Sequence, residues 1–356
     1  MTDLSKNSVL QIFLRFAQNF LEIIFVAIIL MQFQNLPENN LRTAQAAELV
    51  VGQTNPNADS HEQSKTTENR PTKIWFITGT SSGFGLEVTK AVLARGDSVA
   101  ATALEPETHS ELKKKYNDKI LPLRLDVTKR DEVDAAVNAA VKFFGRIDVV
   151  LNNAGIGYWG AVEELSEAEL WKQMDVNFFG SFRVIQAVLP VLQKQRCGHI
   201  IQISSIAGHT AFRLGGAYSC SKWAVEALNE TVAIETEKFG INVSIIEPGP
   251  FKTNFFKSIK YAENVMEKYS PNFDPAKLNQ IDNKKITSKE RIAELELLGI
   301  RIMDGSNYEE PANVACEILK VADEKKPPLR VIVGKGAREF VEKTYKKRLE
   351  EWKNWK

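Results

Sequence analysis

Residues 74–85 read Ile-Trp-Phe-Ile-Thr-Gly-Thr-Ser-Ser-Gly-Phe-Gly, a short apolar run followed by a glycine-rich turn. The apolar run predicts a buried parallel strand. Glycine allows the backbone to turn tightly near a ligand, and a helix N-terminus presents free N–H groups to an anion. Because Val88, Ala91 and Val92 follow at helical spacing, this stretch predicts a strand, a turn and a helix that bind a pyrophosphate. The alternative is a glycine-rich connection without a ligand.

Strands and helices alternate from this turn towards the C-terminus. The apolar residues between Val133 and Phe144 recur at helical spacing and are followed by Gly145, which predicts an amphipathic helix. Apolar runs predict further strands at 98–103, 120–127, 147–151, 199–204, 241–247 and 329–333. This alternation predicts an α/β fold in which helices cover both faces of a parallel sheet.

The composition excludes several classes of protein. Among 356 residues, 46 Lys plus Arg balance 45 Asp plus Glu, so no basic excess indicates a nucleic-acid partner. Cys197, Cys220 and Cys316 form no CxxC pair, which argues against a disulfide framework or a cysteine zinc site. The four histidines show no metal-ligand spacing. We therefore expect no metal site.

The N-terminal part of the chain differs from the rest. Residues 1–35 include a continuous apolar run from Ile23 to Met31, which is marginal for a membrane-spanning helix. A membrane anchor, a signal sequence ending near residues 44–46, and an amphipathic or unstructured extension all remain open. Residues 36–71 are rich in polar side chains and are expected to form a linker.

A candidate acid–base pair lies at Tyr218 and Lys222. Residues four apart share one face of a helix, so the phenol and the ammonium can point into the same cleft. A nearby cation favours the phenolate, which can then exchange a proton with an alcohol or ketone oxygen. Ser205, at the end of an expected strand, could hold the same oxygen. Taken alone, Tyr-x-x-x-Lys is also the pattern of an ordinary surface pair.

The order of the motifs along the chain resembles the short-chain dehydrogenase/reductase family. The glycine-rich turn, Asn152-Asn153-Ala154-Gly155, Ser205, Tyr218 with Lys222, and Pro248-Gly249 follow one another as in that family. The branch that contains hydroxysteroid and retinol dehydrogenases is the most similar. The resemblance implies a Rossmann-like, doubly wound, mostly parallel seven-stranded sheet in a single catalytic domain with an N-terminal extension.

The resemblance also implies roles for the catalytic residues. Tyr218 corresponds to the general acid/base, Lys222 to the partner that lowers its pKa, and Ser205 to the group that orients the substrate oxygen. Asn177 corresponds to the residue that holds a proton-relay water beside the lysine. A position where a helix kinks is the other interpretation of Asn177.

The implied cofactor is NADP(H) or NAD(H). The residues that the resemblance assigns to its binding, in addition to Tyr218 and Lys222, are Gly79, Ser81, Ser82, Gly83, Phe84, Gly85, Asp126, Val127, Asn152, Ala154, Gly155, Pro248, Gly249 and Thr253. Asp126 could instead cap the end of its strand. Family members that use NAD carry an acidic residue at the end of the second strand, and NADP users carry Arg nearby. This chain has Ala103-Leu104-Glu105 there, which leaves the preference undecided.

The expected organisation is a catalytic domain over 72–336, with a lid-like insertion at 257–310 and a C-terminal helix at 337–356. Side chains near Tyr158, Trp159 and Phe212 and the segment after Thr253 are expected to set substrate specificity. The resemblance to the hydroxysteroid and retinol dehydrogenase branch implies a hydrophobic alcohol or carbonyl substrate. Because nicotinamide cofactors are mainly intracellular, we expect a cytoplasmic catalytic domain, with possible membrane association through the N-terminus. The resemblance implies a homo-oligomer. The alternative function is a non-enzymatic NAD(P)-sensing protein tethered by its N-terminus.

Overall fold

Seven parallel strands form the central sheet of the computed structural model, which describes residues 71–263 and 309–355. The strand order across the sheet is β3-β2-β1-β4-β6-β7-β9. The strands are β1 (Ile74–Thr78), β2 (Ser98–Ala103), β3 (Ile120–Arg124), β4 (Val149–Asn152), β6 (Gly198–Ile203), β7 (Ile241–Pro248) and β9 (Arg330–Val333). The expected parallel seven-stranded sheet is confirmed.

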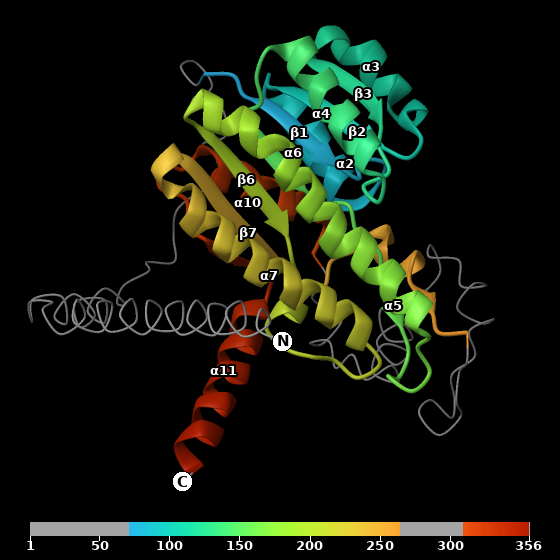
Figure 1. Ribbon diagram of the computed structural model, residues 1–356, viewed down its shortest axis with the longest axis vertical. Helices are drawn as coiled ribbons and strands as arrows, with labels where there is room; N and C mark the ends of the chain where they lie inside the picture. Colours follow the sequence, from blue (N-terminus) through green and yellow to red (C-terminus); the bar gives the residue numbers. More distant parts are fainter. Residues whose placement is uncertain (1–70, 264–308, 356) are drawn as a thin grey trace, which may run out of the picture. The chain divides into compact units, whose positions relative to one another are not determined.

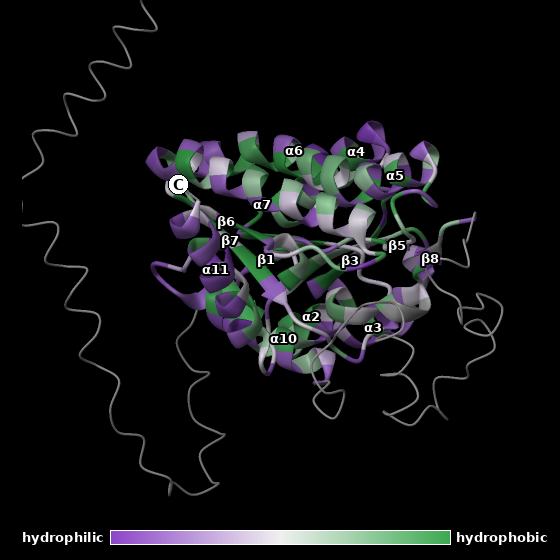
Figure 2. Cartoon of the chain, turned by 90° about the horizontal axis from the view of Figure 1, so that it is seen from below, coloured by the Kyte–Doolittle hydropathy of each residue, from purple (hydrophilic) through white to green (hydrophobic). Residues whose placement is uncertain are grey.

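Helices cover both faces of this sheet, as Figures 1 and 2 show. One layer contains α4 (Arg130–Phe144), α5 (Glu167–Met174), α6 (Gly180–Gln195) and α7 (Gly216–Thr236). The opposite layer contains α2 (Gly83–Ala94), α3 (Ser110–Tyr116) and α10 (Pro311–Asp323). Each layer packs on its own set of buried strand residues, so the sheet separates two hydrophobic clusters. A final helix, α11, spans Ala337–Asn354.

The amphipathic helix predicted before Gly145 is confirmed as α4. Its buried residues are Val133, Ala136, Val137 and Ala140, which lie on one face of the helix. Gly145 ends the helix with φ of 83°, in the left-handed region that glycine enters without strain. The apolar spacing of the sequence was therefore sufficient to place this helix and its buried face.

Two predicted strands have different bounds in the structure. The strand expected over 120–127 ends at Arg124, because the carboxylate of Asp126 accepts the N–H of Thr128 at 2.9 Å and closes a turn there. The strand expected over 147–151 begins at Val149. Asp148, just before it, directs its carboxylate to the N–H of Ile74 at 2.8 Å. At both strand ends a carboxylate side chain thus bonds to a nearby backbone N–H.

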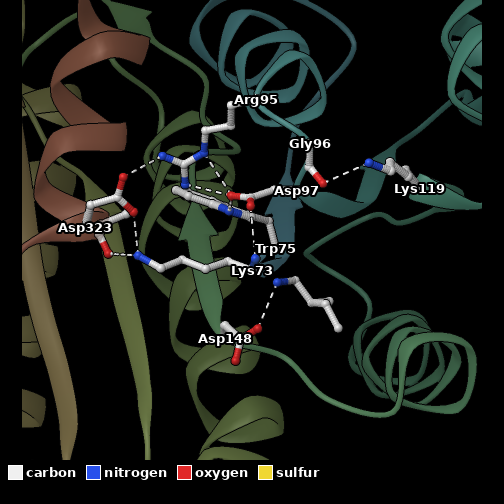
Figure 3. A network of polar contacts seen from close by, with 10 residues as sticks. Lys73, Trp75, Arg95, Gly96, Asp97, Lys119, Asp148 and Asp323 are labelled. Atoms are coloured by element: carbon white, nitrogen blue, oxygen red, sulfur yellow. Dashed lines mark hydrogen bonds and ion pairs between the residues drawn. The ribbon is translucent and has the colours of Figure 1, made fainter. Parts of the chain in front are cut away.

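A buried carboxylate fixes the start of β1 (Figure 3). Asp97 is fully buried and accepts hydrogen bonds from the N–H of Lys73 at 2.9 Å and from Nε1 of Trp75 at 3.0 Å. Arg95 lies 2.7 Å from the same carboxylate and 2.9 Å from Asp323 at the end of α10. The network joins β1, the loop before β2, and α10 around a charge that is fully desolvated.

Several predicted segments lie outside the described residues. These are the N-terminal segment 1–35, the linker 36–71 except for Pro71, and most of the insertion 257–310. At the start of that insertion, β8 (Lys260–Tyr261) pairs in parallel with β5 (Tyr158–Trp159). Among the helices of residues 71–263 and 309–355, none is long and apolar enough to cross a membrane.

Candidate active site

The chain reverses its winding direction between β1 and β4, which are hydrogen-bonded neighbours. From β1 the strands run outward to β2 and β3, and the chain then returns to place β4 on the other side of β1. Connections that leave two adjacent strands in opposite directions open a crevice beyond their carboxyl ends. A cavity of about 660 Å³ lies there.

Most of the predicted site residues line this cavity. They are Gly79, Ser81, Ser82, Gly83, Phe84, Asp126, Val127, Ala154, Gly155, Ser205, Tyr218, Lys222, Pro248, Gly249 and Thr253. Three predicted residues, Gly85, Asn152 and Asn177, are absent from its walls. Their places in the fold show what each one contacts instead.

The turn between β1 and α2 has the backbone that the glycine pattern predicts. Gly79 and Gly83 have φ of 69° and 56°, which favour glycine. A Cβ on Gly85 would lie 2.3 Å from the carbonyl oxygen of Gly79, so the start of α2 packs directly on the turn. Ser82, the N-cap of α2, makes no side-chain capping bond. The first turn of this helix is therefore open to an anion such as a pyrophosphate.

Asn153, which the sequence analysis did not select, holds this turn. Its Nδ2 donates to the carbonyl oxygens of Thr78 at 2.8 Å and of Gly79 at 2.9 Å. Its backbone N–H donates to Oγ1 of Thr78 at 3.0 Å. Asn153 also lines the cavity. The side chain therefore fixes the geometry of the turn from a position against the start of α2, where a Cβ on Gly85 would lie 2.5 Å from its Nδ2.

Asn152 lies one residue earlier and does not reach the cavity. It is the last residue of β4 and is buried among its neighbours, and its carbonyl oxygen accepts a bond from Nε2 of Gln202 at 3.3 Å. Successive strand residues point to opposite faces, so only one of the two asparagines can face the turn. The structure gives that place to Asn153.

Tyr218, Lys222 and Ser205 meet on one wall of the cavity. Tyr218 and Lys222 lie one turn apart in α7, with Nζ of Lys222 located 5.5 Å from the centre of the tyrosine ring. Nζ also donates to the carbonyl oxygen of Ile203 at 3.0 Å, at the end of β6. Ser205, two residues later, lines the same cavity, and its hydroxyl lowers the pKa of Tyr218. The structure thus brings Ser205, which follows β6, to the two groups that the sequence spacing placed on one helix.

Burial shifts both titrating groups in the direction of the uncharged form. It raises the pKa of the Tyr218 phenol to about 12, and the hydrogen bond with Ser205 opposes this rise. Burial also lowers the pKa of Lys222 to about 8, against the negative charge of Glu226. At neutral pH the phenol therefore retains its proton, and most of Lys222 remains an ammonium. This protonation state suits the donation of a proton to an oxygen beside Tyr218.

Asn177 lies beneath the cavity in a single turn of π-helix over Asp175–Phe179. Its Oδ1 accepts the N–H of Ile156 at 2.9 Å, and its Nδ2 donates to Oγ of Ser221 at 3.0 Å. The irregular turn agrees with the helix-kink interpretation. The bonds link α7, next to Lys222, to the loop after β4, and the water-holding role remains a prediction.

Asp126 combines two properties that the sequence analysis treated as alternatives. It lines the cavity, as an adenine contact would require. Its Oδ1 also accepts the N–H and the hydroxyl of Thr128, at 2.9 and 2.7 Å, so the carboxylate caps the end of its own strand.

Aromatic rings pack against the ring of Tyr218. The rings of Trp159 and Phe255 lie with their centres 5.1 and 5.3 Å from that of Tyr218. Phe212 lines the same cavity, as does Phe340 of α11, which sequence reasoning did not connect with the site. The pairing of β5 with β8 brings Trp159 close to the segment that carries Phe255. Four aromatic side chains thus line the cavity near Tyr218.

At the end of β2, the cavity wall includes Ala103 and Leu104, whereas Glu105 is not part of it. Leu104 is 62% exposed. The position where an acidic side chain would bind ribose hydroxyls, or Arg a phosphate, thus holds a solvent-facing apolar residue.

The chain matches a family model and several known proteins. Residues 73–264 match the short chain dehydrogenase model. Oxidoreductase BOA17 of Botryotinia fuckeliana is 38% identical over 273 residues, which cover 76% of this chain and 92% of that protein. The 3-ketodihydrosphingosine reductase of Bacteroides thetaiotaomicron is 36% identical over 262 residues, which cover 74% and 88% of the two chains.

Solved structures agree with these matches. A short-chain dehydrogenase from Streptomyces avermitilis superposes with a TM-score of 0.67 at 32% identity, over 81% of this chain and 97% of that one. The protein ElxO with NADP bound superposes with a TM-score of 0.59 at 25% identity, over 76% and 100% of the two chains.

Proposed function

Because this chain belongs to the short-chain dehydrogenase family, and is thus an NAD(P)-dependent oxidoreductase of CH–OH groups, we propose that Tyr218, Lys222 and Ser205 carry its proton transfer and that its substrate is hydrophobic. The observation that carries the proposal is that Tyr218, Lys222 and Ser205 line the same cavity, with Tyr218 and Lys222 one turn apart on α7.

The residues of the cavity suit a dinucleotide. Gly79 and Gly83 have backbone angles that favour glycine, no side-chain capping bond of Ser82 covers the first turn of α2, and a Cβ at Gly85 has no room. The turn therefore offers N–H groups to the two phosphates. We propose that Asp126 and Val127 contact the adenine, and that Pro248, Gly249 and Thr253 contact the nicotinamide end. When bound, the cofactor supplies or accepts the hydride.

The catalytic groups then manage the proton. In the reducing direction, the phenol of Tyr218 gives its proton to the substrate oxygen as the carbonyl carbon gains hydride, and the Lys222 ammonium stabilises the phenolate that remains. In the oxidising direction, the phenolate takes the proton of the alcohol. Ser205 holds the substrate oxygen near Tyr218. Both directions require Lys222 to be charged.

Two observations support a hydrophobic substrate. Trp159 and Phe255 pack against the ring of Tyr218, and Phe212 and Phe340 line the same cavity. A relative that is 36% identical is named 3-ketodihydrosphingosine reductase. An apolar wall stabilises an alkyl or ring group next to the reacting carbon by burying it.

The test is oxidation of NADPH and of NADH by the full chain, with hydrophobic ketones and aldehydes beside small polar ketones. We expect the hydrophobic carbonyls to have the higher kcat/KM. Tyr218→Phe should lower kcat about 10²-fold or more and leave cofactor affinity unchanged. Tyr116→Phe, outside the cavity wall, is the matched control. Full activity in Tyr218→Phe would refute the proposed role, and cofactor binding without any turnover would favour the sensing alternative.

A further inference from the structure

Behind the catalytic wall, four ionisable side chains meet. Glu247 is fully buried, and Glu226 and His209 are each 6% exposed. The potential ligand atoms of these three residues all lie within 4.8 Å of one another. Arg330, at the start of β9, completes the group. We call His209, Glu226, Glu247 and Arg330 the buried ion cluster.

Each member of the buried ion cluster adjoins a segment of the site. His209 follows Ser205 by one short turn, Glu247 directly precedes Pro248, and Glu226 lies one helical turn after Lys222. The hydroxyl of Tyr345 in α11 lies 2.9 Å from Nδ1 of His209. The cluster therefore joins the ends of β6 and β7 to α7 and α11.

Each carboxylate of the cluster lies close to a basic side chain. Nε of Arg330 lies 3.1 Å from Oε2 of Glu226 and 3.5 Å from Oε1 of Glu247. Nε2 of His209 lies 2.9 Å from Oε2 of Glu247. Because a guanidinium already stands between the two carboxylates, the group is an ion-pair network rather than an empty metal site. A buried carboxylate is retained only where such partners compensate its desolvation.

We propose that Glu226 is a positioning residue that keeps the Lys222 side chain charged, and that the rest of the buried ion cluster holds its carboxylate for that purpose. The inference rests on the proposed role of Lys222. Residues four apart on a helix lie on one face with Cβ atoms about 5–6 Å apart. The hydrogen bond from the ammonium goes to a neutral carbonyl, that of Ile203. The charge that opposes its desolvation is that of Glu226.

The electrostatics of the neighbours agree with this arrangement. Burial lowers the pKa of Lys222 to about 8, and the charge of Glu226 raises it. The pKa of Glu226 is itself raised, by burial first and then by the charge of Glu247, while the Ser204 hydroxyl, Arg330 and His209 lower it. Arg330 and His209 thus help Glu226 to stay ionised. Tyr218 is the other titrating group beside the ammonium.

Removing the charge of Glu226 would make the Lys222 ammonium less stable. Without the charge of Glu226, the pKa of Lys222 falls below about 8, because burial then acts unopposed. A charge at this spacing shifts it by on the order of one unit. At pH 8 the ammonium fraction would fall from about one half to about one tenth. Since Tyr218 needs that cation, turnover would fall about five-fold at this pH, and the alkaline limb of the pH profile would move to lower pH.

The experiment compares full-length Glu226→Gln with Glu230→Gln. Glu230 lies one turn further along α7 and contacts the same Arg330, at 2.8 Å, but is largely exposed. The titration of Lys222 is read by competitive acetylation with acetic anhydride, followed by peptide mass spectrometry. This readout needs no turnover. The pH profile of kcat is measured in parallel, and cofactor affinity and melting temperature report on the fold.

We expect the Lys222 midpoint to fall by about one unit in Glu226→Gln and to match the parent in Glu230→Gln. Should Glu226→Gln fail to fold, the double variant with Arg330→Gln removes the unpaired guanidinium as well and should show the same fall. A parental midpoint in folded Glu226→Gln, or in the folded double variant, overturns the inference. Absence of turnover in the parent would instead refute the proposed function, while the acetylation still tests the role of Glu226.

Discussion

Substituting Gly85 by Ala tests how the phosphate turn is built. A Cβ at this position would lie 2.3 Å from the carbonyl oxygen of Gly79 and 2.5 Å from Nδ2 of Asn153. The first contact is with backbone, and the second is with an amide held by two hydrogen bonds to the same turn. Neither neighbour can move without disturbing the turn between β1 and α2.

The expected magnitude follows from these contacts. Forcing one extra carbon into a packed site costs about 1–3 kcal/mol. The free Gly85→Ala protein can relieve the contact by moving the Gly79 carbonyl outward. Cofactor binding must then restore the original turn, so this cost appears as weaker binding. We therefore expect the cofactor Kd to rise at least about ten-fold, which corresponds to about 1.4 kcal/mol. The free energy of unfolding should fall by up to about 3 kcal/mol.

Gly83→Ala is the matched control in the same turn. There the Cβ would meet only Cβ of Thr253 at 3.9 Å, but φ of 56° makes alanine strained. The expected cost is about 1–2 kcal/mol from backbone strain alone. Cofactor affinity is measured by fluorescence titration, and stability by urea unfolding. Parental affinity and stability in Gly85→Ala would refute the close packing of α2 on the turn.

Three further predictions concern other parts of the molecule. Asp97→Asn weakens the bonds that a fully buried carboxylate accepts from Lys73 and Trp75, so the free energy of unfolding should fall by about 2–4 kcal/mol in urea titrations. Burial lowers the pKa of His199 to about 3; because the unfolded chain takes up this proton below about pH 6.5, stability should fall between pH 7 and 5 by about 2 kcal/mol more in the parent than in His199→Gln. Leu104→Arg places a cation at the cavity wall after β2, and steady-state kinetics should show a preference shifted at least about ten-fold towards NADPH; an unchanged ratio would place the ribose elsewhere.

Local sequence determined much of this protein. The strand, turn and helix over 74–94, and the amphipathic helix before Gly145, follow from patterns that extend over a few residues, and they appear as expected. Tyr218 and Lys222 share a wall of the cavity because residues four apart share a face of any helix. The family resemblance also implied the doubly wound, mostly parallel seven-stranded sheet that the structure has.

Tertiary structure decided which side chains face one another across elements. Whether Asn152 or Asn153 reaches the turn depends on where β4 ends and how its last residue faces. Trp159 meets Tyr218, and Phe340 enters the cavity, only because distant segments pack together. The buried ion cluster draws its four members from β6, α7, β7 and β9 or the turns that follow them, and no spacing in the sequence could reveal it. Patterns along a chain report local geometry, whereas contacts between distant residues exist only after the sheet has brought its strands together.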